Sequence, residues 1–289
     1  MTTETLESPA LYVVATPIGN LEDITLRAKR VLENCDLIAA EDTRVTAKLL
    51  QLLGLPKKKL VSFYDQIEQK KAGELIAKIK EEGISLALVS DAGTPLISDP
   101  GYHLTKLAHE EEVKVIPIPG PSSLTSLVSA SGLPNSRVLF LGFLPKKKNQ
   151  MKTEMESWSS FNSSVVFFES TKRIVKTMEA MVEIYPQAQV CVGRELTKKN
   201  ETIRQDSCSS LLVWLKEKAV LKGELAVMVS LPKQEEKVSV EEVTEQIKKF
   251  LKSDPSVPTK DLVKRLQDTG FNQKELYQLI IKLKTSLLH

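Results

Sequence analysis

Short apolar runs that each end in a polar loop rich in glycine or proline recur along this chain, and they restrict its fold more than any other feature. The clearest case spans residues 84–101, where the apolar run 86–89 leads into two turns that contain Asp91 and Asp99. Such a run suits a buried strand and is too short for a helix to be the better interpretation. Loops at the carboxyl ends of buried strands are where open α/β sheets bind ligands. The segment therefore predicts part of a ligand site, with an ordinary surface loop as the alternative.

Similar junctions precede and follow this segment. Strands are expected at residues 11–15, 36–40, 60–63 and 113–118, with segments of helical apolar spacing between them. Asp23 or Thr25 is expected to cap the first of these helices, and Ser122 or Ser123 the last. Alternating strands and helices predict a mostly parallel sheet with helices on both faces. The polar loops would then form a crevice at one end of this sheet.

The rest of the chain has two further parts. Expected strands at 138–144, 164–168, 188–192 and 224–229 have fewer helices between them, which predicts a mixed sheet. After a charged linker at 232–238, two short helices separated by Gly270 predict a helix-turn-helix, with Asn272 capping the second helix. A three-helix packing or dimerisation module is the alternative. The predicted organisation is a disordered lead-in at 1–10, α/β domains at 11–119 and 120–232, and a helical domain at 238–289.

Composition narrows the class of protein. The formal net charge of +3 means that any nucleic-acid contact depends on local clusters of Lys and Arg. Cys35, Cys191 and Cys208 are odd in number and far apart, which is typical of a reducing compartment and of neither a disulfide framework nor a zinc site. The N-terminus lacks a signal-peptide pattern, and no apolar run approaches the length of a membrane span. These features predict a cytoplasmic protein without a metal site.

Four loop motifs, in their order along the chain, are similar to those of one enzyme family. They are TPIGNL at 16–21, AEDTR at 40–44, SDAGTPLISDPG at 90–101 and PGPS at 119–122. The chain resembles the tetrapyrrole-methylase-like methyltransferases, which depend on S-adenosyl-L-methionine, and among them the ribosomal RNA small subunit methyltransferase I family. FESTKR at 168–173, RELTK at 194–198 and KGE at 222–224 extend the resemblance, and the terminal helices resemble the helix-turn-helix domain of that family.

The resemblance implies a fold, an activity and a set of site residues. The fold would be the two-domain class III methyltransferase fold with a C-terminal helix-turn-helix domain, and the protein would be a homodimer. The activity would be 2′-O-methylation of a cytidine in 16S rRNA of the small ribosomal subunit, with S-adenosyl-L-methionine as cofactor. From the matching motifs, the implied cofactor contacts are Pro17, Asp91, Gly93, Thr94, Pro95, Gly120, Ser122, Ser123, Glu169, Ser170 and Ala226.

A ribose hydroxyl is a very weak acid, so a carboxylate or a positioned water must take up its proton. Asp42 is the first candidate because it follows a strand and opens a helix beside the expected cleft. Glu41 and Asp65 are further catalytic candidates, and the remaining alternatives are Asp99, Glu169 and Glu195. For each acid, the competing role is a helix cap or a salt bridge with Arg44, Arg173 or Arg194. The family often has a His/acid/His-Asn cluster where this chain has YDQI at 64–67, so a histidine base is absent there.

Basic residues in three places are candidates for contact with RNA phosphates. They are Lys146, Lys147 and Lys148 with Lys152 in one loop, Arg173 and Arg194 at the cleft mouth, and Lys260, Lys264, Arg265 and Lys274 in the terminal helices. Two other functions stay open: a tetrapyrrole or small-molecule methyltransferase on the same fold, and a non-catalytic RNA-binding assembly factor. The basic loop and terminal helices favour RNA over a small substrate, which needs neither.

Overall fold

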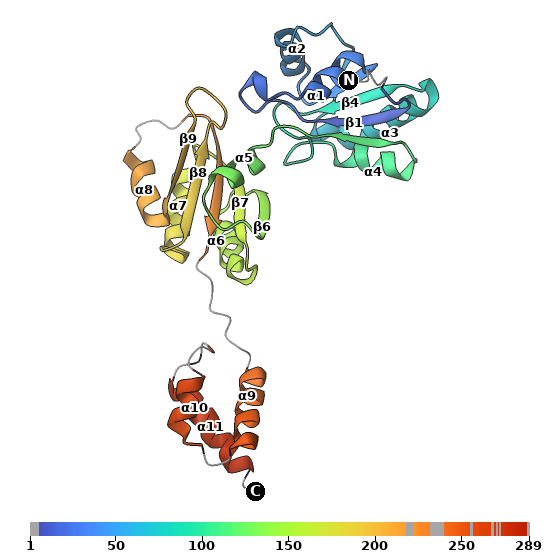
Figure 1. The fold of residues 1–289 in the computed structure, drawn as a ribbon. Coiled ribbons are helices and arrows are strands. Elements are labelled where there is room, and N and C mark those ends of the chain that lie inside the picture. Colours follow the sequence, from blue (N-terminus) through green and yellow to red (C-terminus); the bar gives the residue numbers. More distant parts are fainter. Residues whose placement is uncertain are drawn as a thin grey trace. The chain divides into compact units, whose positions relative to one another are not determined.

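The computed structural model describes residues 6–217, 222–231, 240–254, 257–266, 269, 271 and 273–287. The chain forms two compact units, Met1–Leu231 and Pro232–His289. The first unit contains two α/β halves, each built on its own five-stranded sheet (Figure 1). No described helix is long and apolar enough to cross a lipid bilayer.

The first half has the predicted parallel sheet. Its strands run in the order β3-β2-β4-β1-β5, and each neighbouring pair is parallel. The strands are β1 (Ala10–Val14), β2 (Leu37–Ala40), β3 (Leu60–Ser62), β4 (Ser85–Val89) and β5 (Val115–Ile118). The helices are α1 (Leu26–Asn34), α2 (Thr43–Leu52), α3 (Asp65–Glu82) and α4 (Tyr102–Glu110), with a short 3₁₀ turn, η1 (Leu21–Asp23).

Alternating side chains of the central strands place helices on both faces of this sheet. Tyr12 and Val14 of β1 pack with α1 and α2, whereas Leu11 packs on the opposite face with α3 and α4. This arrangement confirms the prediction from the strand pattern, because successive strand residues point to opposite faces. Thr25 caps α1 by accepting a hydrogen bond from the Ala28 amide, as predicted.

A short helix, α5 (Ser123–Ala130), leads into the second half. Its sheet has the order β6-β7-β10-β8-β9 and is mixed, as predicted, since only β6 and β7 are parallel. The strands are β6 (Val138–Phe143), β7 (Ser164–Ser170), β8 (Gln189–Arg194), β9 (Thr202–Ser207) and β10 (Glu224–Ser230). The helices are α6 (Lys148–Ser157), η2 (Trp158–Ser160), α7 (Ile174–Ile184) and α8 (Cys208–Glu217).

The two faces of the second sheet have different neighbours. One face packs on α6, α7 and α8 around the buried side chains of Trp158 and Phe167. The other face packs on α5 and on Ile18 from the first half, so the two halves share a small apolar core. Strand β9 and helix α8 were not predicted from the sequence.

The start of the chain differs from the prediction in two ways. Strand β1 begins at Ala10, one residue before the predicted start. Residues 6–10, expected within a disordered lead-in, contact the first half instead: the Tyr12 hydroxyl donates to the Glu7 carbonyl at 2.9 Å, and the Ser8 hydroxyl donates to the Gly83 carbonyl. Residues 1–5 lie outside the described residues.

The second unit is helical. It contains α9 (Val240–Ser253), α10 (Thr259–Arg265) and α11 (Gln273–Leu287), which share a core that includes Ile247, Leu262 and Ile280. The predicted turn at Gly270 and the predicted cap at Asn272 lie outside the described residues, as does the linker at 232–238.

Candidate active site

The loop between β4 and α4, residues 90–101, is hydrogen-bonded to the loops that follow β1 and β5. Thr16 and Gly93 exchange two backbone hydrogen bonds, of 2.8 and 3.0 Å. The Thr94 hydroxyl donates to the Pro121 carbonyl at 3.1 Å. These bonds hold three carboxyl-end loops of the parallel sheet together, at the edge where such sheets bind ligands.

Carboxylates connect the same loop to the loop after β2. Glu41 accepts a hydrogen bond from the Asp91 amide at 3.2 Å, and Asp91 in turn accepts one from the Asp42 amide at 3.0 Å. The two loops are therefore joined by reciprocal bonds, which fix the positions of the Glu41 and Asp91 side chains.

The second part of the 90–101 loop has an unusual backbone. Leu96 and Ser98 have φ values of 71° and 68°, and Gly101 has a φ of 143°. Residues other than glycine rarely adopt a positive φ. A backbone conformation of this kind is kept only where the surrounding structure holds it in place. Here the buried Glu68 of α3 accepts hydrogen bonds from the amides of Gly101, at 3.0 Å, and His103, at 2.6 Å. Glu68 thereby holds the end of the loop and the start of α4.

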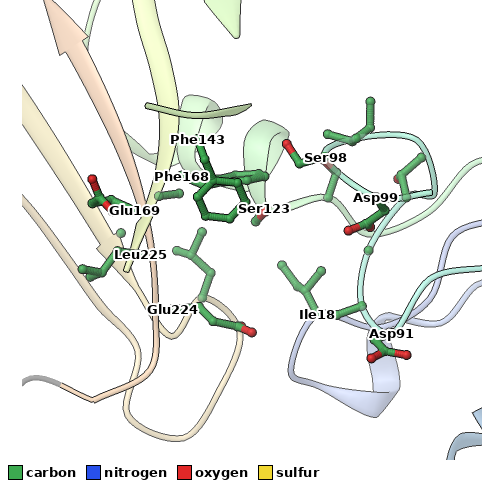
Figure 2. Close-up of a pocket in the computed structure, with 18 of the residues that line it drawn as sticks. Ile18, Asp91, Ser98, Asp99, Ser123, Phe143, Phe168, Glu169, Glu224 and Leu225 are labelled. Carbon is green, nitrogen blue, oxygen red and sulfur yellow. The ribbon is translucent and has the colours of Figure 1, made fainter. Parts of the chain in front are cut away.

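A cavity of about 410 Å³ lies against this loop, with the two halves of the first unit forming opposite walls (Figure 2). The first-half wall comes from loops after β1, β2, β4 and β5, and the second-half wall comes from β6, β7, β8 and β10 with the loops beside them. The lining residues are Ile18, Glu41, Asp91, Ala92, Gly93, Thr94, Ile97, Ser98, Asp99, Ser122, Ser123, Phe143, Phe168, Glu169, Ser170, Gly193, Leu196, Gly223, Glu224, Leu225 and Ala226.

The cavity is strongly acidic. Five of the described lining residues are Asp or Glu, and none of them is Lys, Arg or His. Burial raises the pKa values of Glu41 and Asp91 above their ordinary range. Burial, together with the nearby charges of Glu41, Asp91 and Asp65, raises the pKa of Asp99 to about 6. In the part of the chain that the structure describes, no group of three or more His, Cys, Asp or Glu side chains is placed to hold a metal ion.

The second-half wall is largely apolar. Phe168 makes edge-to-face contacts with Phe140 and Phe143, with ring centroids 4.9 and 5.8 Å apart. Phe143 is nevertheless 60% exposed, so one side of its ring is available to a ligand. Figure 2 shows Phe143, Phe168, Glu169 and Leu225 across the cavity from Ser98 and Asp99.

Glu169 is the one deeply buried carboxylate in the described cavity lining, with 2% of its surface exposed. It accepts hydrogen bonds from the Ser170 amide and the Thr177 hydroxyl, both at 2.7 Å, and lies 3.3 Å from the guanidinium of Arg173. A buried carboxylate requires such partners, because an unpaired buried charge is strongly destabilising. Glu169 is therefore a structural anchor of this wall.

The rim of the cavity carries an ion-pair network. Lys198 lies 2.9 Å from Glu195 and 2.9 Å from Glu224, and Glu195 also accepts a hydrogen bond from the Glu224 amide. A side chain at Gly223 would collide with the Glu195 carboxylate. The adjacent Thr197 hydroxyl accepts a hydrogen bond from the Asn20 amide at 3.0 Å, which connects this rim to the first half.

Most of the cofactor contacts predicted from the motifs line the cavity, and three do not. Those on the cavity are Asp91, Gly93, Thr94, Ser122, Ser123, Glu169, Ser170 and Ala226, and those away from it are Pro17, Pro95 and Gly120. A Cβ atom at Gly120 would lie 2.9 Å from the Ala15 side chain. Glycine at this position is therefore explained by strand packing without reference to a ligand.

The predicted proton acceptors are distributed differently from expectation. Glu41 lines the cavity, whereas Asp42 and Asp65 do not. Asp42 caps α2 and accepts three hydrogen bonds from the guanidinium of Arg44, which hold the pKa of its carboxyl at about 2. A carboxylate with so low a pKa is a weak base. The contacts of Asp42 are explained by its two structural roles, the cap of α2 and the salt bridge with Arg44.

Several lining residues had no distinguishing signal in the sequence. Phe143 and Leu225 look like ordinary strand residues. Ile18 and Phe168 belong to the TPIGNL and FESTKR motifs but were not singled out as site residues. Ser98 lies in the SDAGTPLISDPG motif, which predicted this loop as part of a ligand site without indicating which of its residues line the cavity. Sheet pairing places these residues at one cavity, and pairing between distant segments cannot be read from local patterns.

The basic residues predicted to contact RNA have different surroundings. Arg173 donates to the carbonyls of Leu144 and Pro145, both at 3.0 Å, and Arg194 donates to the carbonyls of Lys222 and Asn200. Lys148 and Lys152 pair with Glu183 of α7. Lys146 and Lys147 are exposed on the loop before α6.

The terminal basic residues lie on two helices of the second unit. Lys260, Lys264 and Arg265 are on α10, and Lys274 is on α11. The Arg265 guanidinium lies over the ring of Phe250, 5.8 Å from its centroid.

Comparison with solved structures supports the fold assignment. Diphthine synthase superposes with a TM-score of 0.57 at 15% identity, covering 76% of this chain and 90% of that one. A uroporphyrin-III C-methyltransferase from Thermus thermophilus, solved with S-adenosyl homocysteine, superposes with a TM-score of 0.52 at 14% identity, covering 76% of this chain and 96% of that one. At these identities the likeness shows the fold alone.

Sequence comparison is more specific. The family model for tetrapyrrole (corrin/porphyrin) methylases matches residues 10–212. Ribosomal RNA small subunit methyltransferase I of Escherichia coli O157:H7 is 45% identical, covering 78% of this chain and 79% of that protein. The protein of the same name from Mesorhizobium japonicum is 38% identical, covering 96% and 92%. The chain belongs to the tetrapyrrole methylases and, within them, to the ribosomal RNA small subunit methyltransferase I family of enzymes.

Proposed function

We propose that this enzyme uses S-adenosyl-L-methionine to methylate the ribose 2′-hydroxyl of a cytidine in 16S rRNA of the small ribosomal subunit. The observation that carries the proposal is the cavity, which has five carboxylates and, among its described lining residues, no cationic side chain. Such a cavity suits a ligand with positive charge. The names of the relatives at 38–45% identity support the RNA substrate.

The residues of the cavity fit this cofactor. Glu41, Asp91 and Asp99 would surround its positively charged groups, since opposite charges attract strongly where water is partly excluded. Ser122 and Ser123 lie at the N-terminus of α5, where unpaired backbone amides favour a carboxylate. The exposed ring of Phe143 would contact an aromatic base.

When bound, S-adenosyl-L-methionine supplies a methyl group on a positively charged sulfur, which departs as a neutral thioether. The protein's contribution is to hold the substrate hydroxyl in line with that methyl group, with the reacting atoms about 3 Å apart. The acidic walls repel phosphate groups, so the RNA backbone stays outside while the ribose edge enters. The rim network of Glu195, Lys198 and Glu224 would support the second-half wall, and the hydrogen bond from the Asn20 amide to the Thr197 hydroxyl would connect it to the first half.

RNA contact is proposed to depend on Lys146 and Lys147 in the first unit and on Lys264 and Arg265 in the second. Their exposure or helical placement supports this, because flexible cationic side chains contact phosphates without reading sequence. We also propose that α10 and α11 act as a helix-turn-helix, that the enzyme is a homodimer and that it works in the cytoplasm. The three buried, unpaired thiols support the last of these.

Transfer of tritium from labelled S-adenosyl-L-methionine tests the proposal. The acceptors are small ribosomal subunits lacking this ribose methylation, naked 16S rRNA and a tetrapyrrole. Label in a single 2′-O-methylcytidine is expected. Label in the tetrapyrrole would instead support a small-molecule methyltransferase, and cofactor binding without any transfer would support a non-catalytic assembly factor.

A further inference from the structure

A ribose within an RNA strand carries a phosphate group on each side, and the acidic cavity repels both of them. The described cavity lining contains five carboxylates and no Lys, Arg or His. A cation just outside the cavity is therefore needed to hold these phosphates close to the site. Such a cation must lie beside the lining, be exposed and keep a hydrogen-bonding edge free of the protein.

The described cations of the second half that lie at the cavity wall or rim are already engaged. Lys198 is paired with two carboxylates of the rim. The guanidinium groups of Arg173 and Arg194 donate to backbone carbonyls of their own half. These three side chains stabilise the second-half wall, so they do not meet the condition of a free edge.

Arg44, in the first turn of α2, combines exposure with a fixed orientation. Its side chain is 88% exposed. Its Nε and Nη2 atoms donate to the Asp42 carboxylate at distances of 2.6–3.2 Å, so one edge of the guanidinium is held. The other edge, formed by Nη1 and the second N–H of Nη2, has no partner among the described residues. Much of the rotamer freedom that an exposed arginine loses on binding a ligand is therefore already restricted.

A short series of contacts connects Arg44 to the cavity. The Asp42 amide donates to Asp91, which lines the cavity, and the Asp42 carboxylate holds Arg44. Burial is the main cause that raises the pKa of Asp91, and the charge of Arg44 acts in the opposite direction. The guanidinium therefore lies within electrostatic reach of the cavity lining, although its side chain is in solvent.

A second cation lies one turn further along α2. Lys48 is exposed and follows Arg44 by four residues. This spacing places two helical side chains on the same face, with Cβ atoms about 5–6 Å apart. Helix α2 therefore presents a stripe of two cations, Arg44 and Lys48, that begins beside the cavity.

We infer that Arg44 binds a phosphate next to the target ribose and that Lys48 binds the adjoining phosphate of the same RNA strand. This inference rests on the proposed function. The free edge of Arg44 presents two parallel N–H donors, which match two phosphate oxygens, whereas Lys48 acts as a point charge. With the phosphate held outside the acidic wall, the ribose edge enters the cavity.

Binding of naked 16S rRNA over a salt series tests the inference. R44Q should weaken binding at least about 5-fold and lower the slope of log affinity against log salt by about 1. K48Q should lower the slope by about 1, and the double variant by about 2. R44K keeps the charge but not the planar group, so it should keep the slope and lose part of the affinity.

K80Q is the matched control for these variants. Lys80 is an exposed cation that lies 2.7 Å from the Glu111 carboxylate, so it resembles Arg44 in its pairing. It lies near the end of α3, which begins at the carboxyl-end edge of the sheet and returns to the start of β4. Lys80 is therefore at the opposite edge of the sheet from the cavity, and K80Q should bind RNA as the wild type does.

Cross-linking locates the contact independently of affinity. Cys35, Cys191 and Cys208 are buried, so a photoreactive maleimide should react selectively with the new thiol of R44C. After irradiation with small ribosomal subunits, labelled R44C should cross-link to nucleotides adjacent to the methylated cytidine. K80C, labelled in the same way, should not cross-link there. A salt bridge with a purely structural role at Arg44 would not produce this difference.

The outcomes distinguish failure of the inference from failure of the proposed function. Calorimetry should show that R44Q binds S-adenosyl-L-methionine as tightly as the wild type. A wild type that methylates RNA, beside an R44Q variant with unchanged RNA affinity and salt slope, would overturn the inference and leave the proposed function standing. An equal loss of slope in K80Q, or cross-links from R44C only at distant nucleotides, would also overturn it. A wild type that methylates no RNA would overturn the proposed function, and the inference with it.

Discussion

The two walls of the cavity are built in opposite ways. The first-half wall consists of loops that hydrogen-bond to one another through Thr16, Gly93, Glu41 and Asp91, and its side chains carry titratable charge. The second-half wall consists mainly of paired strands. Its character comes from packed aromatic rings and from two carboxylates with partners, the buried Glu169 and Glu224, which is paired with Lys198. The carboxylates with raised pKa values therefore lie in the first half and the exposed aromatic surface lies in the second, so each can be perturbed separately.

Removal of an aromatic ring behind the second wall should have the largest effect. Phe167 is fully buried beside Trp158, and F167A should lower the free energy of unfolding by about 3–5 kcal/mol. F143A, at the exposed ring on the cavity, should lower it by about 0.5 kcal/mol while weakening cofactor binding. Urea unfolding measures the free energy of unfolding of both variants, and calorimetry measures their affinity for the cofactor. Equal stability losses in the two variants would contradict the division between packed core and ligand surface.

Substitution of Gly223 tests whether the rim network of Glu195, Lys198 and Glu224 supports cofactor binding. G223A places a side chain against the Glu195 carboxylate at a φ of +101°, so it should destabilise by about 1–3 kcal/mol and weaken cofactor binding. G73A on the exposed side of α3 is the control, since nothing lies within 4 Å of an added Cβ. It should stabilise by about 0.5–1 kcal/mol. Unchanged cofactor affinity in G223A would show that the rim network does not hold the site.

The acidic wall predicts stability changes of opposite sign at pH 7. Asp99 has a raised pKa, so its ionised form opposes folding above about pH 6, and D99N should stabilise by roughly 1 kcal/mol after allowance for solvent screening. Asp42 has a lowered pKa, so its contribution is present above its ordinary pKa of 3.8 and is lost as pH falls towards 2. D42N should therefore destabilise. The D99N gain should shrink as pH falls from about 6 towards the ordinary pKa of 3.8 and vanish below that value, where Asp99 is protonated in both the folded and the unfolded state. Denaturant midpoints across pH measure both effects.

The smallest expected effects concern RNA binding. R173K keeps the charge but loses the planar group that bonds to Leu144 and Pro145, so it should weaken RNA binding without changing its salt dependence. K146Q and K147Q should each reduce the slope of log affinity against log salt by about 1. Filter binding over a salt series distinguishes weaker binding with an unchanged salt dependence from a reduced slope. An RNA affinity that R173K leaves unchanged would show that the bonds to the Leu144 and Pro145 carbonyls do not support RNA binding.

The sequence was most informative where local pattern and tertiary structure agree. The five strands of the first half begin and end within two residues of prediction, because each is an apolar run bounded by turn residues. Strand β9 has a single large apolar residue, Ile203, and is defined by its ladder with β8 at the sheet edge. Its segment therefore carried no local signal for a strand.

The site was predictable as a set of loops but not as a set of contacts. The 90–101 loop was identified from its turns. Asp42 was placed first among the bases because it follows a strand and opens a helix, and the sequence could not decide between that role and a cap or a salt bridge with Arg44. Likewise, the residue type of Arg173 does not distinguish a guanidinium bound to carbonyls from one that is free to bind phosphate.

The acidic lining also decides which adenosine compounds the cavity admits. ATP shares its nucleoside with the proposed methyl donor but carries several negative charges, which would lie opposite Glu41, Asp91 and Asp99. Within the described lining no Lys, Arg or His compensates them, and like charges at short range repel strongly where water is partly excluded. The acidic lining therefore predicts that ATP competes poorly with the proposed methyl donor for this cavity.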